Sequence, residues 1–175
     1  MMEHGQVQRY AQIQGEGTVR RVSLTNTINA PLAVVWEAIT TLEQVQLWWP
    51  DWQPGGIIEP AEGGTIRLGD GSWIDGLIKV WRPPHILEFT WQEQPTNNPD
   101  WYEAATCSLL RIDLVELGAA KTGLNLVQFM PAASAPGGAA GWHHFAGERL
   151  KSLLETGKVE DTAGRIEELL KLYSA

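Results

Sequence analysis

The 175-residue sequence is poor in cysteine and contains no long apolar run. Its single cysteine, Cys107, excludes a disulfide framework and a zinc site built from cysteines. No stretch approaches the ~18 consecutive apolar residues that a membrane-spanning helix needs. The polar start, Met1 to Gln14, lacks the apolar segment and cleavage site of a secretory signal. These absences predict a soluble protein of a reducing compartment, the cytoplasm.

Positive charge is also scarce. The sequence has 13 Lys+Arg against 21 Asp+Glu, which gives a formal net charge of -8 at pH 7. The acidic excess is concentrated between Ala30 and Ala104. Because no segment forms the basic stripe that neutralises phosphates or anionic lipid headgroups, we expect neither nucleic acid nor a membrane surface as a partner.

The common catalytic and nucleotide-binding motifs are missing as well. The sequence has no Gly-x-Ser-x-Gly elbow, no Walker loop and no Gly-x-Gly-x-x-Gly after a strand. His143 and His144 are consecutive, so on a helix they point about 100° apart and cannot share a metal ion as residues i and i+4 can. The sequence therefore predicts no metal site and no cofactor, and it identifies no catalytic residue.

The first half of the sequence predicts one strand followed by two short helices. Residues 21–28 alternate between apolar and polar, which is typical of a half-buried strand. Pro31 precedes apolar residues at helical spacing, as at the start of a helix. Thr41 and Gln44 have the spacing of a capping box, which predicts a second short helix that ends at Pro50.

From Gly55 onward, short apolar runs separated by Gly, Pro and Asp predict an antiparallel sheet, and the last third predicts helices. The expected strands are 65–68 and 72–81 around a Gly69-Asp70-Gly71 turn, then 86–92, 106–117 and 122–129. After a small-residue linker, 132–140, an amphipathic helix runs to Gly157, and a further helix covers 166–173. We divide the chain into a polar N-terminal segment (1–17), one folded domain (18–157) and an extra C-terminal helix (158–175).

Several short residue groups occur in the order of one known family. They are Ile28-Asn29-Ala30-Pro31, Val35-Trp36, Ala38-Ile39-Thr40, Leu47-Trp48-Trp49, Asp75-Gly76, Arg82-Pro83-Pro84, Leu87-Glu88-Phe89-Thr90-Trp91 and Gly141-Trp142-His143-His144-Phe145. This ordered set, over about Ser23 to Gly157, resembles the START-like (SRPBCC, helix-grip) superfamily. Within it, the sequence is similar to the family related to the C-terminal domain of the activator of the 90-kilodalton heat-shock chaperone ATPase.

The resemblance implies an α+β helix-grip fold. A curved antiparallel sheet would wrap around a long C-terminal helix, with two short helices after the first strand. An apolar cavity would lie between sheet and helix and would hold a small apolar ligand.

Nine tryptophans must find places in this fold, and most are expected to be core. Trp48, Trp49 and Trp52 gather where regular structure ends, so we place them at the rim of the pocket. Arg149 falls inside the apolar sector of the long helix, where its guanidinium needs a carboxylate, a carbonyl or a ligand anion, unless it reaches solvent. The candidate ligand-binding residues are Trp48, Trp49, Trp52, Trp91, Trp142, His143, Phe145 and Arg149.

Three functions remain open. The first, which we favour, is binding of a small hydrophobic or aromatic ligand, with no catalysis. The second is a cyclase-like or dehydratase-like enzyme, in which His143, Asp75 and Arg149 would converge on a substrate. The third is a chaperone-associated stress-response module that binds its partner through the acidic surface or the last helix. The apolar side chains of 166–173 could pack on the same chain or form a homodimer, and we favour the dimer.

Overall fold

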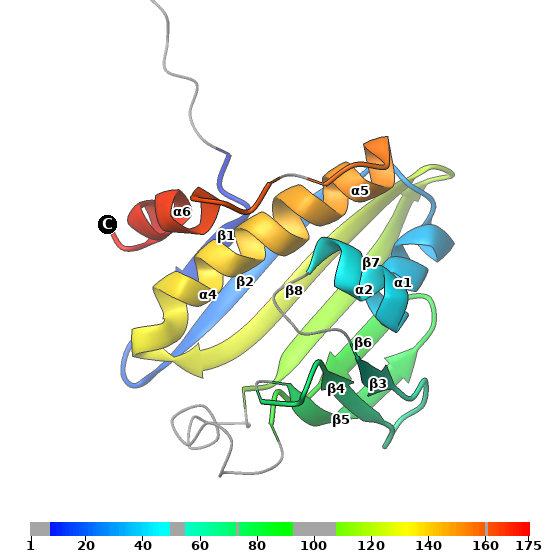
Figure 1. The fold of residues 1–175 in the computed structure, drawn as a ribbon, viewed down its shortest axis with the longest axis horizontal. Helices are drawn as coiled ribbons and strands as arrows, with labels where there is room; N and C mark the ends of the chain where they lie inside the picture. The colour runs from blue at the N-terminus through cyan, green and yellow to red at the C-terminus, as the bar shows by residue number, and fades with distance from the viewer. Residues whose placement is uncertain (1–7, 50–54, 73, 93–107, 160) are drawn as a thin grey trace, which may run out of the picture.

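The computed structural model describes residues 8–49, 55–72, 74–92, 108–159 and 161–175 (Figure 1). Eight antiparallel strands form one curved sheet in the order β1-β2-β8-β7-β6-β5-β4-β3. The strands are β1 (Ala11–Gln14), β2 (Val19–Ile28), β3 (Gly56–Ile58), β4 (Thr65–Leu68), β5 (Asp75–Arg82), β6 (Ile86–Phe89), β7 (Leu110–Gly118) and β8 (Lys121–Pro131). This confirms the predicted α+β helix-grip fold.

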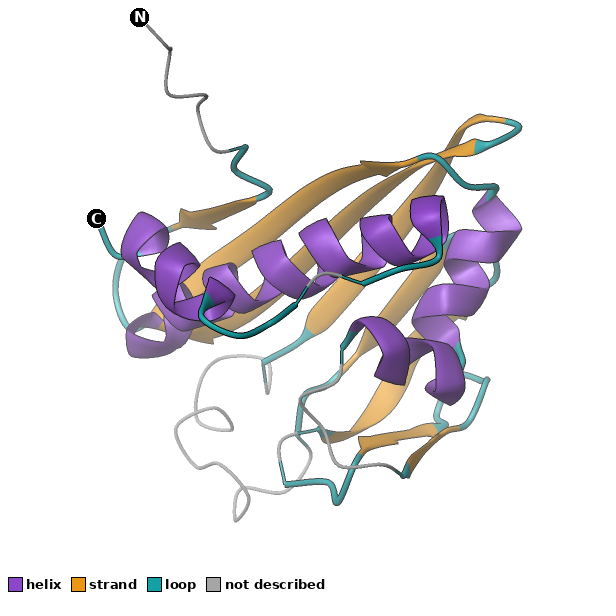
Figure 2. Cartoon of the chain, turned by 45° about the horizontal axis from the view of Figure 1, so that its top comes forward, coloured by secondary structure: helices purple, strands orange, loops and turns teal. Residues whose placement is uncertain are grey.

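The helices pack on one face of this sheet (Figures 1 and 2). They are α1 (Leu32–Thr40), α2 (Leu42–Trp48), η2 (Ala132–Ser134), α4 (Ala135–Trp142), η3 (His143–Arg149), α5 (Leu150–Thr156) and α6 (Arg165–Tyr173). The segments η2, α4, η3 and α5 follow one another without a break and form the long helix, which lies across β2 and β8. No helix in the described ranges is long and apolar enough to cross a membrane.

The long helix contains a wide, π-type turn in its middle. In this turn the N–H of Leu150 donates to the carbonyl of Phe145, five residues earlier. Asn26, which is buried on the inner face of β2, donates through Nδ2 to the carbonyls of Ala146 at 2.9 Å and Gly147 at 3.0 Å. The strand side chain therefore supplies hydrogen bonds where the widened turn departs from regular α-helical pairing, and it fixes the helix on the sheet.

Three local predictions differ from the structure. Thr41 does not form the capping box, because its hydroxyl donates to the carbonyl of Glu37 in the preceding helix at 2.9 Å. The expected linker 132–140 is already helical, in η2 and α4. The small Gly138 lets α4 lie close to β8, because a Cβ there would clash with the sulfur of Met130. The N-terminal segment contains strand β1, which pairs with β2 at the edge of the sheet.

The last helix packs on its own chain. Leu169 and Tyr173 of α6 are buried, and α6 lies beside α4 (Figure 1). Leu170 remains 40% exposed. The apolar side of the predicted C-terminal helix is thus largely used within the molecule, while the homodimer stays a prediction.

Candidate functional site

An apolar pocket lies where α2 and the long helix face the strands from β3 to β7. Its lining consists of Ile39, Val45, Trp48, Trp49, Ile58, Ile66, Leu68, Leu87, Phe89, Leu110, Ile112 and Trp142. The cavity measures about 20 Å³, enough for roughly one water molecule, within about 340 Å³ of space between atoms that is partly open to solvent. None of these described lining residues is charged, so the pocket favours an apolar occupant.

Tryptophan rings fill most of this pocket. The ring of Trp49 lies 5.7 Å from that of Trp48, 4.8 Å from that of Trp142 and 5.8 Å from that of Trp91. Trp49 is the first residue after α2, and its backbone (φ -126°, ψ 74°) has left the helical region. The ring of Trp48 is held by a hydrogen bond from its Nε1 to the carbonyl of Ala38 at 2.9 Å. Trp48 at the end of α2, Trp91 after β6 and Trp142 of α4 therefore surround the ring of Trp49.

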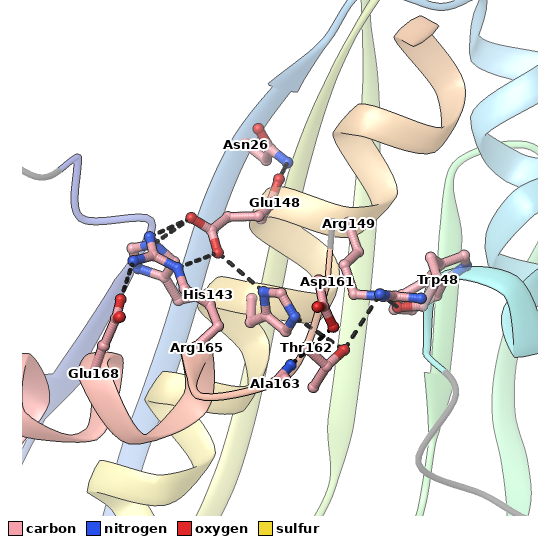
Figure 3. Close-up of polar contacts among 12 residues, drawn as sticks. Asn26, Trp48, His143, Glu148, Arg149, Asp161, Thr162, Ala163, Arg165 and Glu168 are labelled. Carbon is pink, nitrogen blue, oxygen red and sulfur yellow. Dashed lines mark hydrogen bonds and ion pairs between the residues drawn. The ribbon is translucent and has the colours of Figure 1, made fainter. Parts of the chain in front are cut away.

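Arg149 anchors the end of α2 to the long helix (Figure 3). Its Nε donates to the carbonyl of Trp48 at 3.1 Å, and its Nη2 donates to the carbonyl of Leu47 at 3.0 Å. Its Nη1 donates to the hydroxyl of Thr162 at 3.2 Å. A cation stabilises the last carbonyls of a helix, and the guanidinium of Arg149 does so at the end of α2. The side chain does not extend into solvent, since Arg149 is only 6% exposed. This contact fixes the tryptophans that cover the pocket.

A buried amide borders the pocket on the β8 side. Gln128 is 1% exposed and accepts a hydrogen bond through Oε1 from the indole Nε1 of Trp142 at 2.8 Å. Trp142 itself lines the pocket. Polar groups of this kind orient ligands in otherwise apolar sites.

A second polar cluster lies on the other side of the long helix, beneath α6 (Figure 3). The Glu148 carboxylate accepts from Arg165 Nε at 2.9 Å, lies 3.0 Å from His144 Nδ1, and lies 3.7 Å from His143 Nε2. His143 Nδ1 is 2.6 Å from the hydroxyl of Tyr173 in α6. The cluster therefore joins α6 to the long helix through buried hydrogen bonds and one ion pair.

Burial, hydrogen bonds and charge shift the pKa values of several side chains in this cluster. Burial alone would raise the pKa of Glu148, but hydrogen bonds from His143, His144 and Arg165, with the charge of Arg165, hold that pKa well below its usual 4.5. The Glu148 carboxylate in turn raises the pKa of Arg165. Burial raises the pKa of the Tyr173 hydroxyl. Glu148 is therefore ionised at neutral pH.

The predicted site residues divide between these two places. Trp48, Trp49 and Trp142 line the pocket, and Trp91 contacts the ring of Trp49. Phe145 is buried but does not belong to the lining. Trp52 lies outside the described residues.

The remaining two candidates do not face the pocket. His143 lies beneath α6, against Tyr10 and Tyr173. Arg149 contacts backbone carbonyls of α2. Asp75, the third member of the predicted catalytic set, pairs with Arg67 at 3.3 Å on another part of the sheet. These three residues have different partners, and the structure does not show them converging.

Three important polar residues were not predicted. Asn26 lies inward between Leu24 and Ile28, and Gln128 lies inward between Leu126 and Met130, so each interrupts an apolar face, and that anomaly was visible in the sequence. Glu148 gave no comparable signal, because on the isolated long helix it belongs to the polar side. The packing of α6, of the segment before it and of Tyr10 buries this part of the helix.

Comparison with known families identifies the chain. The family described as "Activator of Hsp90 ATPase homolog 1-like protein" matches residues 29–155, which is most of the chain. The chain belongs to this family. The match begins just after β2 and ends in α5, so it includes the pocket and leaves α6 outside. No curated protein sequence matches the chain significantly.

Solved structures share the fold of this Activator of Hsp90 ATPase homolog 1-like chain. A conserved protein of unknown function from Enterococcus faecalis has a TM-score of 0.73 and 17% identity, with 94% of this chain and 88% of that chain covered. CalU16 from Micromonospora echinospora has a TM-score of 0.66 and 20% identity, with coverages of 94% and 96%. An HSP90 activator from Plasmodium falciparum has a TM-score of 0.51 and 20% identity, with coverages of 64% and 72%.

Proposed function

We propose that this protein binds a small apolar or aromatic molecule, about the size of an indole, between α2, the long helix and the sheet. The observation that carries this proposal is the pocket itself, which has an entirely apolar lining and is occupied by the ring of Trp49. An aromatic ligand in place of that ring would contact Trp48, Trp91 and Trp142. Aromatic pairs at these distances are favourable beyond the area they bury.

The small cavity determines how such a ligand would enter. Typical ligand sites measure ~300 Å³ or more, and the cavity of about 20 Å³ is far smaller. The ligand must therefore displace a side chain. Trp49 is the suitable one, because it lies beyond the last residue of α2, whereas Trp48 belongs to the helix and Arg149 holds its carbonyl. The proposal thus describes an exchange of one aromatic ring for another.

Native mass spectrometry tests this function on the protein purified from its own source. We expect a stoichiometric organic compound that is released on denaturation. A Leu68→Trp variant, which enlarges a pocket-lining side chain, should lose the compound, while Leu117→Trp, at an exposed position of β7, should retain it. A wild-type protein that is always at its bare mass, and that does not bind apolar aromatic probes at millimolar concentration, would contradict the proposal.

A second candidate is association with a chaperone of the 90-kilodalton heat-shock class. It is favoured by the family and by the fold shared with the Plasmodium falciparum HSP90 activator. The test is the ATPase rate of the chaperone from the same organism, measured with and without this protein. An increase that saturates with added protein supports the candidate, and an unchanged rate together with no co-sedimentation rejects it.

A further inference from the structure

The amide of Gln128 has one orientation only. The indole Nε1 of Trp142 can donate but cannot accept a hydrogen bond, so the Gln128 atom 2.8 Å away must be the oxygen, Oε1. The Nε2 donors of Gln128 then point elsewhere. Nε2 is fully buried and has no hydrogen-bond partner among the residues that the structure describes.

A buried donor without an acceptor destabilises the folded protein, because its hydrogen bond to water is lost and not replaced. Such a group is retained where an acceptor from outside the chain completes it. Gln128 therefore indicates an acceptor that is not a residue of the described chain.

Gln128 is placed next to the pocket by the β-sheet register. Its Cα is paired with that of Leu110 across the β7–β8 ladder, so both side chains are on the same face of the sheet. Leu110 lines the pocket, and so does Trp142, the hydrogen-bond partner of Gln128. Gln128 is thus adjacent to two residues of the pocket lining, to which it does not itself belong.

We infer that the ligand of this pocket carries a neutral hydrogen-bond acceptor, such as a ketone oxygen, on an apolar ring skeleton, and that Gln128 Nε2 donates to this oxygen. The inference rests on the proposed function, because it concerns the same pocket. The acceptor is neutral because no described lining residue is charged, and an anion there would lack a counter-charge. Gln128 selects among apolar molecules, while the tryptophans provide their contact surface.

Two probes with the same ring skeleton, one with and one without a hydrogen-bond acceptor, measure how much the acceptor contributes to binding. Indane and 1-indanone have fused rings of indole size and differ by one ketone oxygen. Calorimetric titration gives the dissociation constant of each probe for the wild type and for Gln128→Met. We expect the substitution to raise the dissociation constant of 1-indanone about fivefold, which is the usual effect of losing one hydrogen bond. The dissociation constant of indane should change less than twofold.

Leu126→Met is the matched control, because Leu126 is buried on the same face of β8 and the exchange nearly conserves volume. It should leave the ratio of the two dissociation constants unchanged. A measurement on the wild type alone covers the case in which Gln128→Met does not fold. The side-chain amide protons of Gln128 should shift downfield in the NMR spectrum with 1-indanone and not with indane.

The outcomes distinguish the two proposals. Suppose that both probes bind the wild type, but Gln128→Met changes neither dissociation constant or changes both equally. The acceptor inference is then wrong, and the proposed ligand pocket is retained. The same conclusion follows if the Gln128 amide protons respond equally to both probes. If neither probe binds the wild type, the proposed function fails, and the acceptor inference fails with it.

Discussion

The Nε atom of Arg149 lies 3.1 Å from the carbonyl oxygen of Trp48, a residue 101 positions earlier in the chain. This contact joins the middle of the long helix to the last turn of α2. A guanidinium at the carboxyl end of a helix satisfies carbonyls that have no partner within that helix, and it complements the helix dipole. The orientation of the tryptophans at the pocket therefore depends on a charge that is itself outside the pocket lining.

Removing this charge should destabilise the protein. We expect Arg149→Met to lower the free energy of unfolding by about 2–3 kcal/mol, because buried hydrogen bonds from a charged donor are lost and the α2 carbonyls remain. Arg149→Lys keeps the charge but not the planar fork, so it should recover only part of the loss. The measurement is urea unfolding at pH 7. Lys151→Met is the control, because Lys151 lies on the same long helix and its ion pair with Glu155 is partly exposed. This substitution should lower the free energy of unfolding by less than about 1 kcal/mol. Equal losses at both positions would contradict this role of Arg149.

The ring of Trp49 should be replaceable by free indole. Trp49→Ala should cost about 3–5 kcal/mol by leaving a cavity, and millimolar indole should raise the melting temperature of this variant. Trp36→Ala is the control, because Trp36 packs against Trp81 at 5.1 Å and does not line the pocket. Equal stabilisation of both variants by indole would show that the effect is unrelated to the pocket.

The elements that sequence analysis predicted correctly are those that depend on local patterns. The alternation in 21–28 became β2, and a hairpin joins β4 to β5 around Gly69-Asp70-Gly71, although its second strand begins at Asp75 and not at residue 72 as predicted. Gly157 ends the long helix with a φ of 78°, the left-handed conformation for which glycine is suited. In each case the sequence pattern that predicts the element lies within a few residues. The ordered motifs of the family resemblance were then enough to predict the helix-grip fold.

The cluster beneath α6 could not be predicted, because its formation depends on packing between distant segments. His144 is on the polar side of the helical wheel, where exposure was expected, yet it is completely buried. It contacts Glu148 on its own helix and Thr162 on the segment that leads to α6. A helical wheel reports which residues share a face, but not which later segment covers that face. Trp48, Trp49, Trp91 and Trp142 were all predicted as candidate ligand-binding residues, but the contacts of the other three rings with that of Trp49 depend on the same packing between distant segments.

The ionised Glu148 should contribute stability that depends on pH. Its folded-state pKa lies below the usual 4.5, so its contribution is complete above about pH 4.5 and is lost as the pH falls below that value. Glu148→Gln lacks this contribution. We expect the wild type to be more stable than the variant by about 2–3 kcal/mol at pH 7, with a smaller difference at pH 3.

Chemical unfolding of both proteins at a series of pH values measures this difference. Glu168→Gln is the matched control, because Glu168 also pairs with Arg165 but its side chain is 69% exposed. It should change stability by less than about 1 kcal/mol at any pH. A Glu148→Gln difference that is constant from pH 7 to pH 3 would contradict the proposed ionisation.

Gly147 allows the N-terminal segment to approach the π-type turn. A Cβ at this position would lie 2.8 Å from Cγ of Tyr10, an atom near the backbone that cannot easily move away. Tyr10 in turn packs edge-on against His143, with ring centroids 4.9 Å apart. We therefore expect Gly147→Ala to destabilise the protein by about 1–3 kcal/mol, although alanine is the better helix former.

The same substitution elsewhere in the long helix should have the opposite sign. Nothing lies within 4 Å of a Cβ built at Gly141, so Gly141→Ala should stabilise the protein by about 0.5–1 kcal/mol through helix propensity alone. Thermal unfolding of both variants under identical conditions gives the comparison. If Gly147→Ala were stabilising as well, Tyr10 would not be held against the helix, and the burial of His143 would have to come from α6 alone.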